Sequence, residues 1–200
     1  MRGWRWGVGA LTLALGSVVA ASPAQTGDGD GRFALKGVGV ATCVQFVRDA
    51  PPNSPAYRSF LNWIDGYTTA VNALSPGLFD SAAWESADVI ARIVQETCTT
   101  RPEAKFGVVA GRVLARVARD GLTTYSDLVA VEANGRPILL YRATLRRMHQ
   151  RLAEQGLYDG PPDARFAVAS KAALKAFQSR EGLPTTGLPD QVTLWKLFRP

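Results

Sequence analysis

The chain has 200 residues, of which 46% are hydrophobic and 20% are charged. This composition excludes a collagen-like or wholly disordered protein, and the length is sufficient for one domain or two small ones. The formal net charge is +6, and loss of Arg2 and Arg5 with an N-terminal leader would reduce it to 6 − 2 = +4. A mild positive charge suits anionic wall polymers or lipid surfaces, and it is equally compatible with no charged partner.

The N-terminal segment has the three-part layout of a secretory signal peptide. Arg2 and Arg5 form a positive start, an uncharged and mostly apolar run covers residues 6–19, and small residues follow. The run falls short of the ~20 apolar residues that a spanning helix needs, which favours cleavage, after Ala21 or Ala24, over retention as a membrane anchor. No Cys stands at the cleavage region to receive a lipid. We therefore expect a periplasmic protein without stable membrane insertion once the signal is removed.

Both cysteines of the sequence, Cys43 and Cys98, follow the predicted signal peptide. An even number of cysteines in an exported chain indicates a disulfide, and two cysteines allow one intramolecular pairing. The bridge would enclose 98 − 43 − 1 = 54 residues, and chain entropy gives roughly 4 kcal/mol for closing such a loop. A metal site is a poor alternative because two distant thiols and a single histidine supply too few soft ligands. No metal and no other cofactor is expected.

The spacing of apolar residues indicates a helical domain over residues 35–118, after a polar, glycine-rich and flexible mature N-terminus at 25–34. Each short helix must bury its apolar stripe against the others, so the bundle would be stapled by the disulfide. The stripes are Val40, Cys43, Val44 and Val47; Tyr57, Phe60, Leu61, Ile64 and Tyr67; Val89, Ile90, Ile93 and Val94; and Phe106, Val109, Val113, Leu114 and Val117.

The two cysteines and the run Trp63-Ile64-Asp65-Gly66-Tyr67, with Asn72 and Pro102, resemble the HdeA-type and Tai-type periplasmic helical proteins over about residues 35–118. This resemblance implies a non-enzymatic protein-interaction domain, as in acid-stress chaperones or in immunity proteins that block wall amidases. Gly66 inside a helix costs about 1 kcal/mol relative to Ala. Close packing of a neighbouring helix over Gly66 is the favoured explanation, and a functional surface of Trp63, Tyr67 and Asn72 is the alternative.

A second helical domain is predicted over residues 138–200, after a linker at 119–137 with a short strand or helix around Leu128 to Val131. Its first helix carries Leu145, Met148, His149 and Leu152 on one face and ends at Gly156. A second helix is expected over about 168–180. A third begins near Asp190, whose carboxylate is a good N-cap. The expected fold class is therefore all-α: a disulfide-stapled bundle followed by a small three-helix domain.

The C-terminal domain resembles the peptidoglycan-binding-domain family over roughly residues 139–198. The resemblance rests on an ordered series of short motifs: Gly156-Leu157-Tyr158-Asp159-Gly160, Asp163, Phe166, Ala172-Ala173-Leu174, Phe177-Gln178, Leu183, Thr186-Gly187, Thr193-Leu194 and Leu197. Ala164 and Ala167 replace glycines that the family often has, which removes backbone freedom from this loop.

The resemblance implies peptidoglycan as the ligand, through its peptide stems or adjoining sugars. Tyr158, Arg165, Gln178 and Thr186 are candidate ligand-binding residues because they lie in or beside the loops. The alternatives are ordinary solvated loop residues and, for Gln178, a structural hydrogen bond.

The sequence carries no recognised catalytic motif of serine hydrolases, zinc peptidases or phosphate-binding loops, so no catalytic residue is expected. Its single histidine, His149, lies on or beside an apolar helix face, where a packed histidine is more common than a catalytic base. We therefore predict a non-catalytic, cell-wall-associated protein that binds no nucleic acid and presents its N-terminal domain to a protein partner. A chaperone or amidase inhibitor whose C-terminal domain no longer binds the wall, and an unrecognised wall hydrolase, remain as alternatives.

Overall fold

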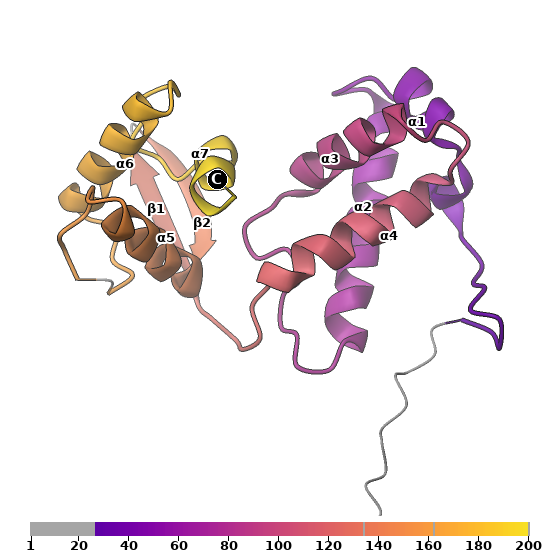
Figure 1. Cartoon of the computed structure of the whole chain (residues 1–200), viewed down its shortest axis with the longest axis horizontal. Coiled ribbons are helices and arrows are strands. Elements are labelled where there is room, and N and C mark those ends of the chain that lie inside the picture. The colour runs from indigo at the N-terminus through magenta and orange to yellow at the C-terminus, as the bar shows by residue number, and fades with distance from the viewer. Residues whose placement is uncertain (1–26, 134, 162, 200) are drawn as a thin grey trace, which may run out of the picture. The chain divides into compact units, whose positions relative to one another are not determined.

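The computed structural model describes residues 27–133, 135–161 and 163–199, so the predicted signal peptide lies outside the described residues. The described chain is mostly helical (Figure 1), which confirms the predicted fold class with the addition of one hairpin. None of the described helices is both long and apolar enough to cross a membrane. The elements are η1 (Gly37–Val40), α1 (Cys43–Asp49), α2 (Pro55–Leu74), α3 (Ala87–Thr99), α4 (Phe106–Val117), η2 (Ala118–Asp120), β1 (Leu128–Ala133), β2 (Arg136–Tyr141), α5 (Arg142–Glu154), α6 (Val168–Arg180) and α7 (Gln191–Phe198).

Residues 27–34 belong to a separate N-terminal unit and contain no helix or strand. The Asp28 carboxylate accepts the backbone N–H groups of Asp30 at 3.0 Å and of Arg32 at 2.8 Å. The same carboxylate pairs with the Arg32 guanidinium at 3.0 Å. These interactions are local, between residues at most four positions apart.

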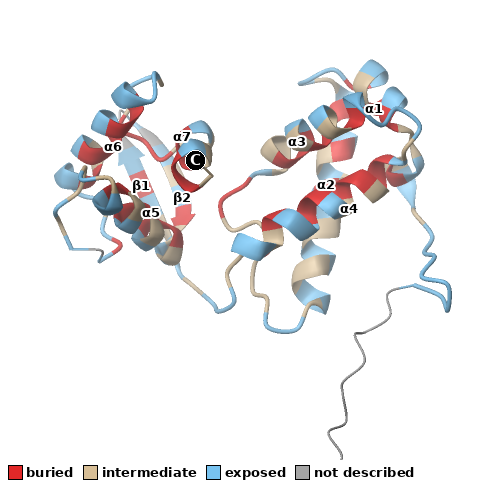
Figure 2. Ribbon diagram, viewed as in Figure 1, coloured by how far each residue is buried: buried red, intermediate tan, exposed pale blue. Residues whose placement is uncertain are grey.

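Helices α1 to α4 share one hydrophobic core, whose buried positions are coloured red in Figure 2. The rings of Phe46, Phe60 and Phe106 meet at its centre, with centroids 4.7 to 4.8 Å apart. Side-chain hydroxyls of Ser54 and Ser86 cap α2 and α3 by accepting backbone N–H groups of the first turn. The core therefore holds four helices, of which α1, α3 and α4 are too short to be stable alone.

The apolar stripe predicted for the first helix is only partly correct. Val40 lies in the 3-10 turn before the helix, and Val44 is 42% exposed. The helix α1 is short, and the residues that it buries are Cys43 and Phe46. Phe46 was missed because the apolar spacing of the valines suggested a different buried face.

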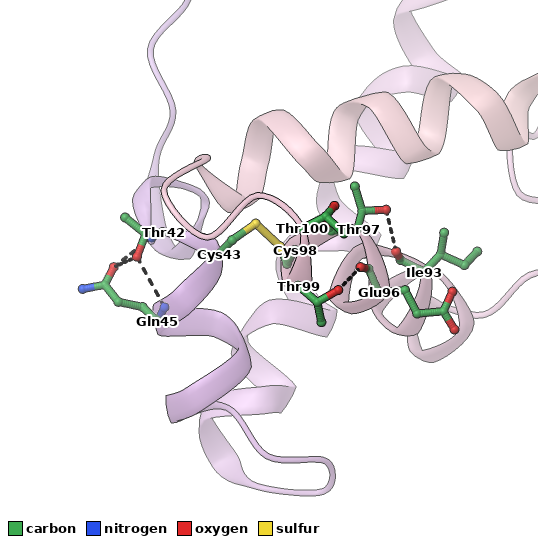
Figure 3. Close-up of a disulfide and its surroundings, with 9 residues drawn as sticks. All are labelled: Thr42, Cys43, Gln45, Ile93, Glu96, Thr97, Cys98, Thr99 and Thr100. Atoms are coloured by element: carbon green, nitrogen blue, oxygen red, sulfur yellow. Dashed lines mark hydrogen bonds between the residues drawn. A yellow bond between two sulfur atoms is a disulfide. The ribbon is translucent and has the colours of Figure 1, made fainter.

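The disulfide between Cys43 and Cys98 is present as predicted, and it joins the first residue of α1 to the last turn of α3 (Figure 3). Both cysteines are buried. Just before the bridge, Thr42 and Gln45 form a capping box, in which the Thr42 N–H donates to the Gln45 side chain and the Gln45 N–H donates to the Thr42 hydroxyl. The Cys43 N–H also donates to the Ala104 carbonyl at 2.8 Å. The bridge is therefore anchored by backbone interactions on the side of α1.

The glycine prediction is wrong at Gly66, which is exposed and would have no atom within 4 Å of an added Cβ. The close approach occurs instead at Gly39 and Gly107, where an added Cβ would lie 2.7 and 3.1 Å from the Trp63 ring. The indole N–H of Trp63 donates to the Lys36 carbonyl at 2.9 Å. The aromatic residue, rather than Gly66, is thus what brings η1, α2 and α4 together.

Strands β1 and β2 form an antiparallel hairpin in which Val129 pairs with Leu140 and Val131 pairs with Ile138. Val131 and Leu140 are 1% and 3% exposed, so this face of the hairpin enters a core. The predicted start of the helical domain at residue 138 is wrong, because residues 138–141 belong to β2 and the helix begins at Arg142. The sequence contains signals that could have shown this, since an Asn-Gly pair flanked by alternating apolar residues is typical of hairpins.

The second core is formed by the hairpin together with α5, α6 and α7, which lie around it in Figure 1. Trp84, from the segment before α3, is also part of this core. The Gln191 side chain holds that segment through both ends of its amide, donating to the Trp84 carbonyl at 2.6 Å and accepting the Ser86 N–H at 3.0 Å. Thus the second core uses residues from well before the predicted domain boundary.

Next to Trp84, the buried Glu85 carboxylate pairs with Arg199 at 2.7 Å. Burial raises the pKa of Glu85 to about 7, although the positive charge of Arg199 opposes that shift. Removal of one partner from such a buried pair leaves the other charge uncompensated. This pair and the Gln191 amide are the polar contacts that attach the 84–86 segment to α7.

Replacing both Cys43 and Cys98 with Ala should lower the free energy of unfolding by about 4 kcal/mol, because the unfolded chain regains the entropy of a loop of 54 residues. Urea unfolding of the variant and of the oxidised wild-type protein measures the difference. Reductant should lower the free energy of unfolding of the wild-type protein by a similar amount and leave that of the variant unchanged. If neither the double substitution nor the reductant lowers the free energy of unfolding, the bridge does not constrain the bundle.

Candidate functional site

Residues 142–199 form a compact module of three helices, and it contains all four residues that the sequence suggested for ligand binding. Asp190 caps α7 as predicted, because its carboxylate accepts the Thr193 N–H at 2.9 Å. Helix α6 spans Val168–Arg180, which also agrees with the prediction. The candidate side chains therefore lie on or beside helices whose bounds the sequence largely predicted.

Gln178 is fully buried at the centre of the module. Its side-chain amide N–H groups lie within 3.1 Å of the Leu188 carbonyl and the hydroxyls of Thr186 and Thr193, and its amide oxygen accepts the Gly187 N–H at 2.8 Å. These bonds hold the loop between α6 and α7 in place. A side chain that is both buried and fully bonded supports this loop and does not itself face a ligand.

Thr186 lies in that loop and is half-buried. Besides Gln178, its hydroxyl contacts the Leu188 N–H at 3.1 Å and the Asp190 carboxylate at 3.4 Å. The structure thus brings Gln178 and Thr186 together, but in a hydrogen-bond network that shapes the loop. Any direct role of Thr186 towards a ligand would have to use the part of its surface that remains open.

Tyr158 is half-buried and stacks on the fully buried His149, with ring centroids 4.3 Å apart. Its hydroxyl donates to the Pro161 carbonyl at 3.0 Å. The Nε2 atom of His149 is 2.9 Å from the Ser170 hydroxyl, which also contacts the Ala167 N–H and the Arg165 carbonyl. Burial lowers the pKa of His149, and the charge of Asp163 opposes this shift. The histidine is therefore a packed residue that supports the loop.

Arg165 is the most accessible of the four candidates, with a side chain 83% exposed and 3.8 Å from the Asp163 carboxylate. The adjacent Ala164 is buried and has φ +60, a conformation that favours glycine. Ala167, by contrast, has φ −110 and needs no glycine. The first of the two departures from the family pattern therefore imposes strain on the loop, and the second does not.

The four candidates divide into two groups. Tyr158 and Arg165 surround Ser170, near the start of α6, whereas Thr186 contacts Gln178 eight residues further along this helix. At 1.5 Å per residue, the two places on the helix are about 12 Å apart. They do not form one compact site.

A hollow of about 570 Å³ lies where the ends of α5, α6 and α7 approach one another, and sequence reasoning missed it. Its charged lining includes Arg151, Arg180 and Lys196, each in the last turn of its helix. Cations there interact favourably with the helix dipoles, so each residue alone has a structural explanation. A basic residue at the end of three successive helices was the available signal, but their convergence depends on the tertiary structure.

Two of these cations already have acidic neighbours. Arg151 pairs with Glu154 at 2.9 Å, and Arg180 lies 3.4 Å from Glu181. Among the described residues, Lys196 has no carboxylate within ion-pair distance. The hollow combines cationic and anionic groups, which suits a ligand that carries both carboxylates and an amine or amide.

In the N-terminal bundle, the residues of the alternative functional surface make structural contacts. Trp63 and Tyr67 stack with centroids 5.2 Å apart. The Asn72 amide oxygen accepts the Ser81 N–H at 2.8 Å, and its amide nitrogen lies 3.3 Å from the Asp80 carboxylate. Packing therefore explains these three residues, although no other segment packs against Gly66.

His149 should make the protein less stable in mild acid. Its folded pKa lies below that of the unfolded chain, so below about pH 6.5 the unfolded state binds a proton that the folded state resists. Glu85 has the opposite effect on stability: its pKa is higher in the folded protein than in the unfolded chain, so protonation of Glu85 in mild acid favours the folded state. Unfolding of His149→Gln and wild type between pH 7.5 and 5 isolates the histidine, and the variant should lose less stability on acidification. Equal pH profiles would contradict a depressed His149 pKa.

Gln178→Leu should lower the free energy of unfolding by about 2–4 kcal/mol, because the buried Gly187 N–H and the Leu188 carbonyl lose their partner. Chemical denaturation measures this cost. Gln150→Leu, at an exposed position of α5, is the matched control and should change stability by less than about 0.5 kcal/mol. Similar effects of the two substitutions would rule out a central role of the Gln178 network.

In the comparisons with known proteins, no curated protein and no solved structure is significantly similar to this chain. The resemblance of residues 35–118 to HdeA-type and Tai-type proteins stays a prediction, because the family match does not extend to them. Residues 142–197 match the family model described as a putative peptidoglycan binding domain, so the chain carries a domain of this family on α5, α6 and α7.

Proposed function

We propose that this protein is exported and binds peptidoglycan through its C-terminal module, which holds the disulfide-linked bundle at the cell wall. The observation that carries the proposal is the family match over residues 142–197, which covers all three helices of the module. The predicted signal peptide supports export, and a disulfide suits an oxidising compartment such as the periplasm.

The hollow at the ends of α5, α6 and α7 is the proposed ligand site. Ligand sites are usually concave, and this hollow is lined by residues of the module alone. The peptide stems of peptidoglycan carry free carboxylates and amines or amides. Lys196 and Arg151 would bind the carboxylates, while Glu154 and Gln155 offer acceptors for N–H donors.

We further propose that the protein is not an enzyme. The single histidine of the chain is fully buried and stacked on Tyr158, so it is not placed to transfer a proton to a bound substrate. The two cysteines are joined in a disulfide and offer no thiolate. The bundle would then act as a protein-interaction domain, which is what its resemblance to chaperones and immunity proteins implies.

The mature protein, residues 25–200, should pellet with purified sacculi at both low and high salt. Arg151→Gln/Lys196→Gln should weaken this binding about tenfold, because two partly exposed contacts with carboxylates are lost at roughly 0.7 kcal/mol each. The measurement is the bound fraction as a function of sacculus concentration. The full mature chain is used because Trp84 and the hairpin both belong to the second core, so a fragment that contains only α5, α6 and α7 would lack part of that core.

Arg142→Gln/Arg146→Gln is the matched control, with the same charge change on α5 but outside the hollow. It should bind as wild type does. If Arg165→Gln weakens binding and the hollow variant does not, the ligand site is the loop at residues 157–167. If wild-type protein stays in the supernatant, the module does not bind the wall, and release of soluble muropeptides would instead indicate a hydrolase.

A further inference from the structure

Besides the hollow in the C-terminal module, the protein has a basic hollow in the bundle, on the α3–α4 side. Neither the resemblance nor the family match explains it. It measures about 220 Å³ and is lined by Arg101, Arg112 and Arg116. Its apolar lining comes from α3 and α4: Ile93, Val109 and Val113. A larger hollow of about 610 Å³ shares Ile93, Val113 and Arg116 with it and reaches Arg119.

These arginines differ from Arg151 and Arg180 of the C-terminal module in lacking acidic partners. Within the described part of the chain, none of Arg101, Arg112, Arg116 and Arg119 has a carboxylate within ion-pair distance. All four are exposed. The larger hollow has two carboxylates in its lining: Glu96 forms no ion pair among the described residues, and Asp120 pairs with Arg147 at 3.5 Å.

This arrangement has a cost for the folded protein. Arg112 and Arg116 are four residues apart on α4, so their charges repel each other across one helical turn. Helix α4 contains no acidic residue that could relieve the repulsion. The helix dipole stabilises Arg116 in the last turn of α4 but not Arg112, which lies before that turn. The stability of the bundle therefore does not explain the pair of arginines, whereas an anionic ligand would remove the repulsion and gain charge-assisted hydrogen bonds.

The size of the hollow restricts the ligand. An α-helix with its side chains is about 10–12 Å wide, which is too large for a hollow of about 220 Å³. A short, extended peptide with small side chains fits, with its carboxylates on the guanidinium groups and a methyl group on Ile93 or Val113. Peptide stems of peptidoglycan have this chemistry, with free carboxylates and alanine residues.

We propose that the α3–α4 hollow is a second wall contact, in which Arg101, Arg112 and Arg116 bind carboxylates of peptidoglycan peptide stems. The inference rests on the proposed function, because the C-terminal module would bring the bundle to a surface where such stems are abundant. Once one site is bound, the other binds at a high effective concentration, so even a weak second contact strengthens attachment. The carboxylates could come from an acidic protein or from wall peptides, and the small size of the hollow favours wall peptides.

The test uses the full mature chain with Arg112→Gln/Arg116→Gln. The control Arg48→Gln/Arg58→Gln has the same charge change in α1 and α2, outside the hollow. The apparent Kd for purified sacculi is measured at several salt concentrations. We expect about a tenfold increase in Kd for the α4 variant, with a weaker dependence on salt, and no change for the control. The melting temperature of the α4 variant should equal or exceed that of wild type, because like-charge repulsion is removed.

Each other outcome overturns the proposal in a distinguishable way. If the α4 variant binds as tightly as wild type, the module binds the wall without the bundle, and the proposed function stands. If both arginine variants bind equally weakly, net charge rather than the hollow is responsible. If poly-L-glutamate displaces the protein more effectively than soluble muropeptides of equal carboxylate content, the hollow binds an acidic protein segment. If wild type does not pellet, both proposals are wrong.

Discussion

The Cys43–Cys98 disulfide is the constraint on which the N-terminal bundle most depends. Helix α1 has only seven residues, and by itself it would not be stable in water. The bridge attaches its first residue to the last turn of α3, while the Cys43 N–H bonds to the Ala104 carbonyl between α3 and α4. The bridge thus joins α1 to α3, and the hydrogen bond to Ala104 holds α1 near the start of α4, around the core of Phe46, Phe60 and Phe106. The arginine-lined hollow lies on the α3–α4 side of this bundle.

The C-terminal module relies on buried polar groups instead of a covalent bridge. Gln178 bonds the loop before α7, and His149 supports the loop before α6 through Tyr158 and Ser170. The Gln178 amide is bonded at both its nitrogen and its oxygen, and such a group specifies one arrangement because alternatives leave it unsatisfied. His149 is bonded through Nε2, while its Nδ1 has no partner among the described residues. The two residues are therefore better understood as supports of these two loops than as ligand-binding residues themselves.

The distribution of charge separates the two hollows. In the module, most cations lie next to carboxylates, so its hollow has a mixed polar character. In the bundle, the arginines on and beside α4 form no ion pair within the described residues, and the smaller hollow has no carboxylate in its lining. If both bind the wall, the module would supply recognition of the stem and the bundle would supply an electrostatic contribution that salt weakens. Such a protein would be held close to the wall with one face occupied and its other faces free for a partner.

The sequence by itself determined the local features of this protein. The spacing of its apolar residues predicted most helices, and Asp190 marked the start of α7 as its N-cap. The two cysteines allowed a single intramolecular pairing. These features depend on neighbouring residues along the chain, or on simple counting. The ordered motifs of the C-terminal module were also sufficient to predict its family, because such motifs reflect a shared local framework.

The tertiary structure alone decided which side chains are open to a ligand. Gln178 is in a loop-side position by sequence but is fully buried, and Gly66 has no helix packed against it, whereas Gly39 and Gly107 lie beneath Trp63. The hairpin also entered the second core, and Trp84 joined that core from more than forty residues away along the chain. The convergence of Arg101 with Arg112 and Arg116, like that of the three helix ends in the module, depends on how helices pack. Periodicity shows that a helix has a buried face, but not which other segment covers it, so the hollows could not be predicted from the sequence.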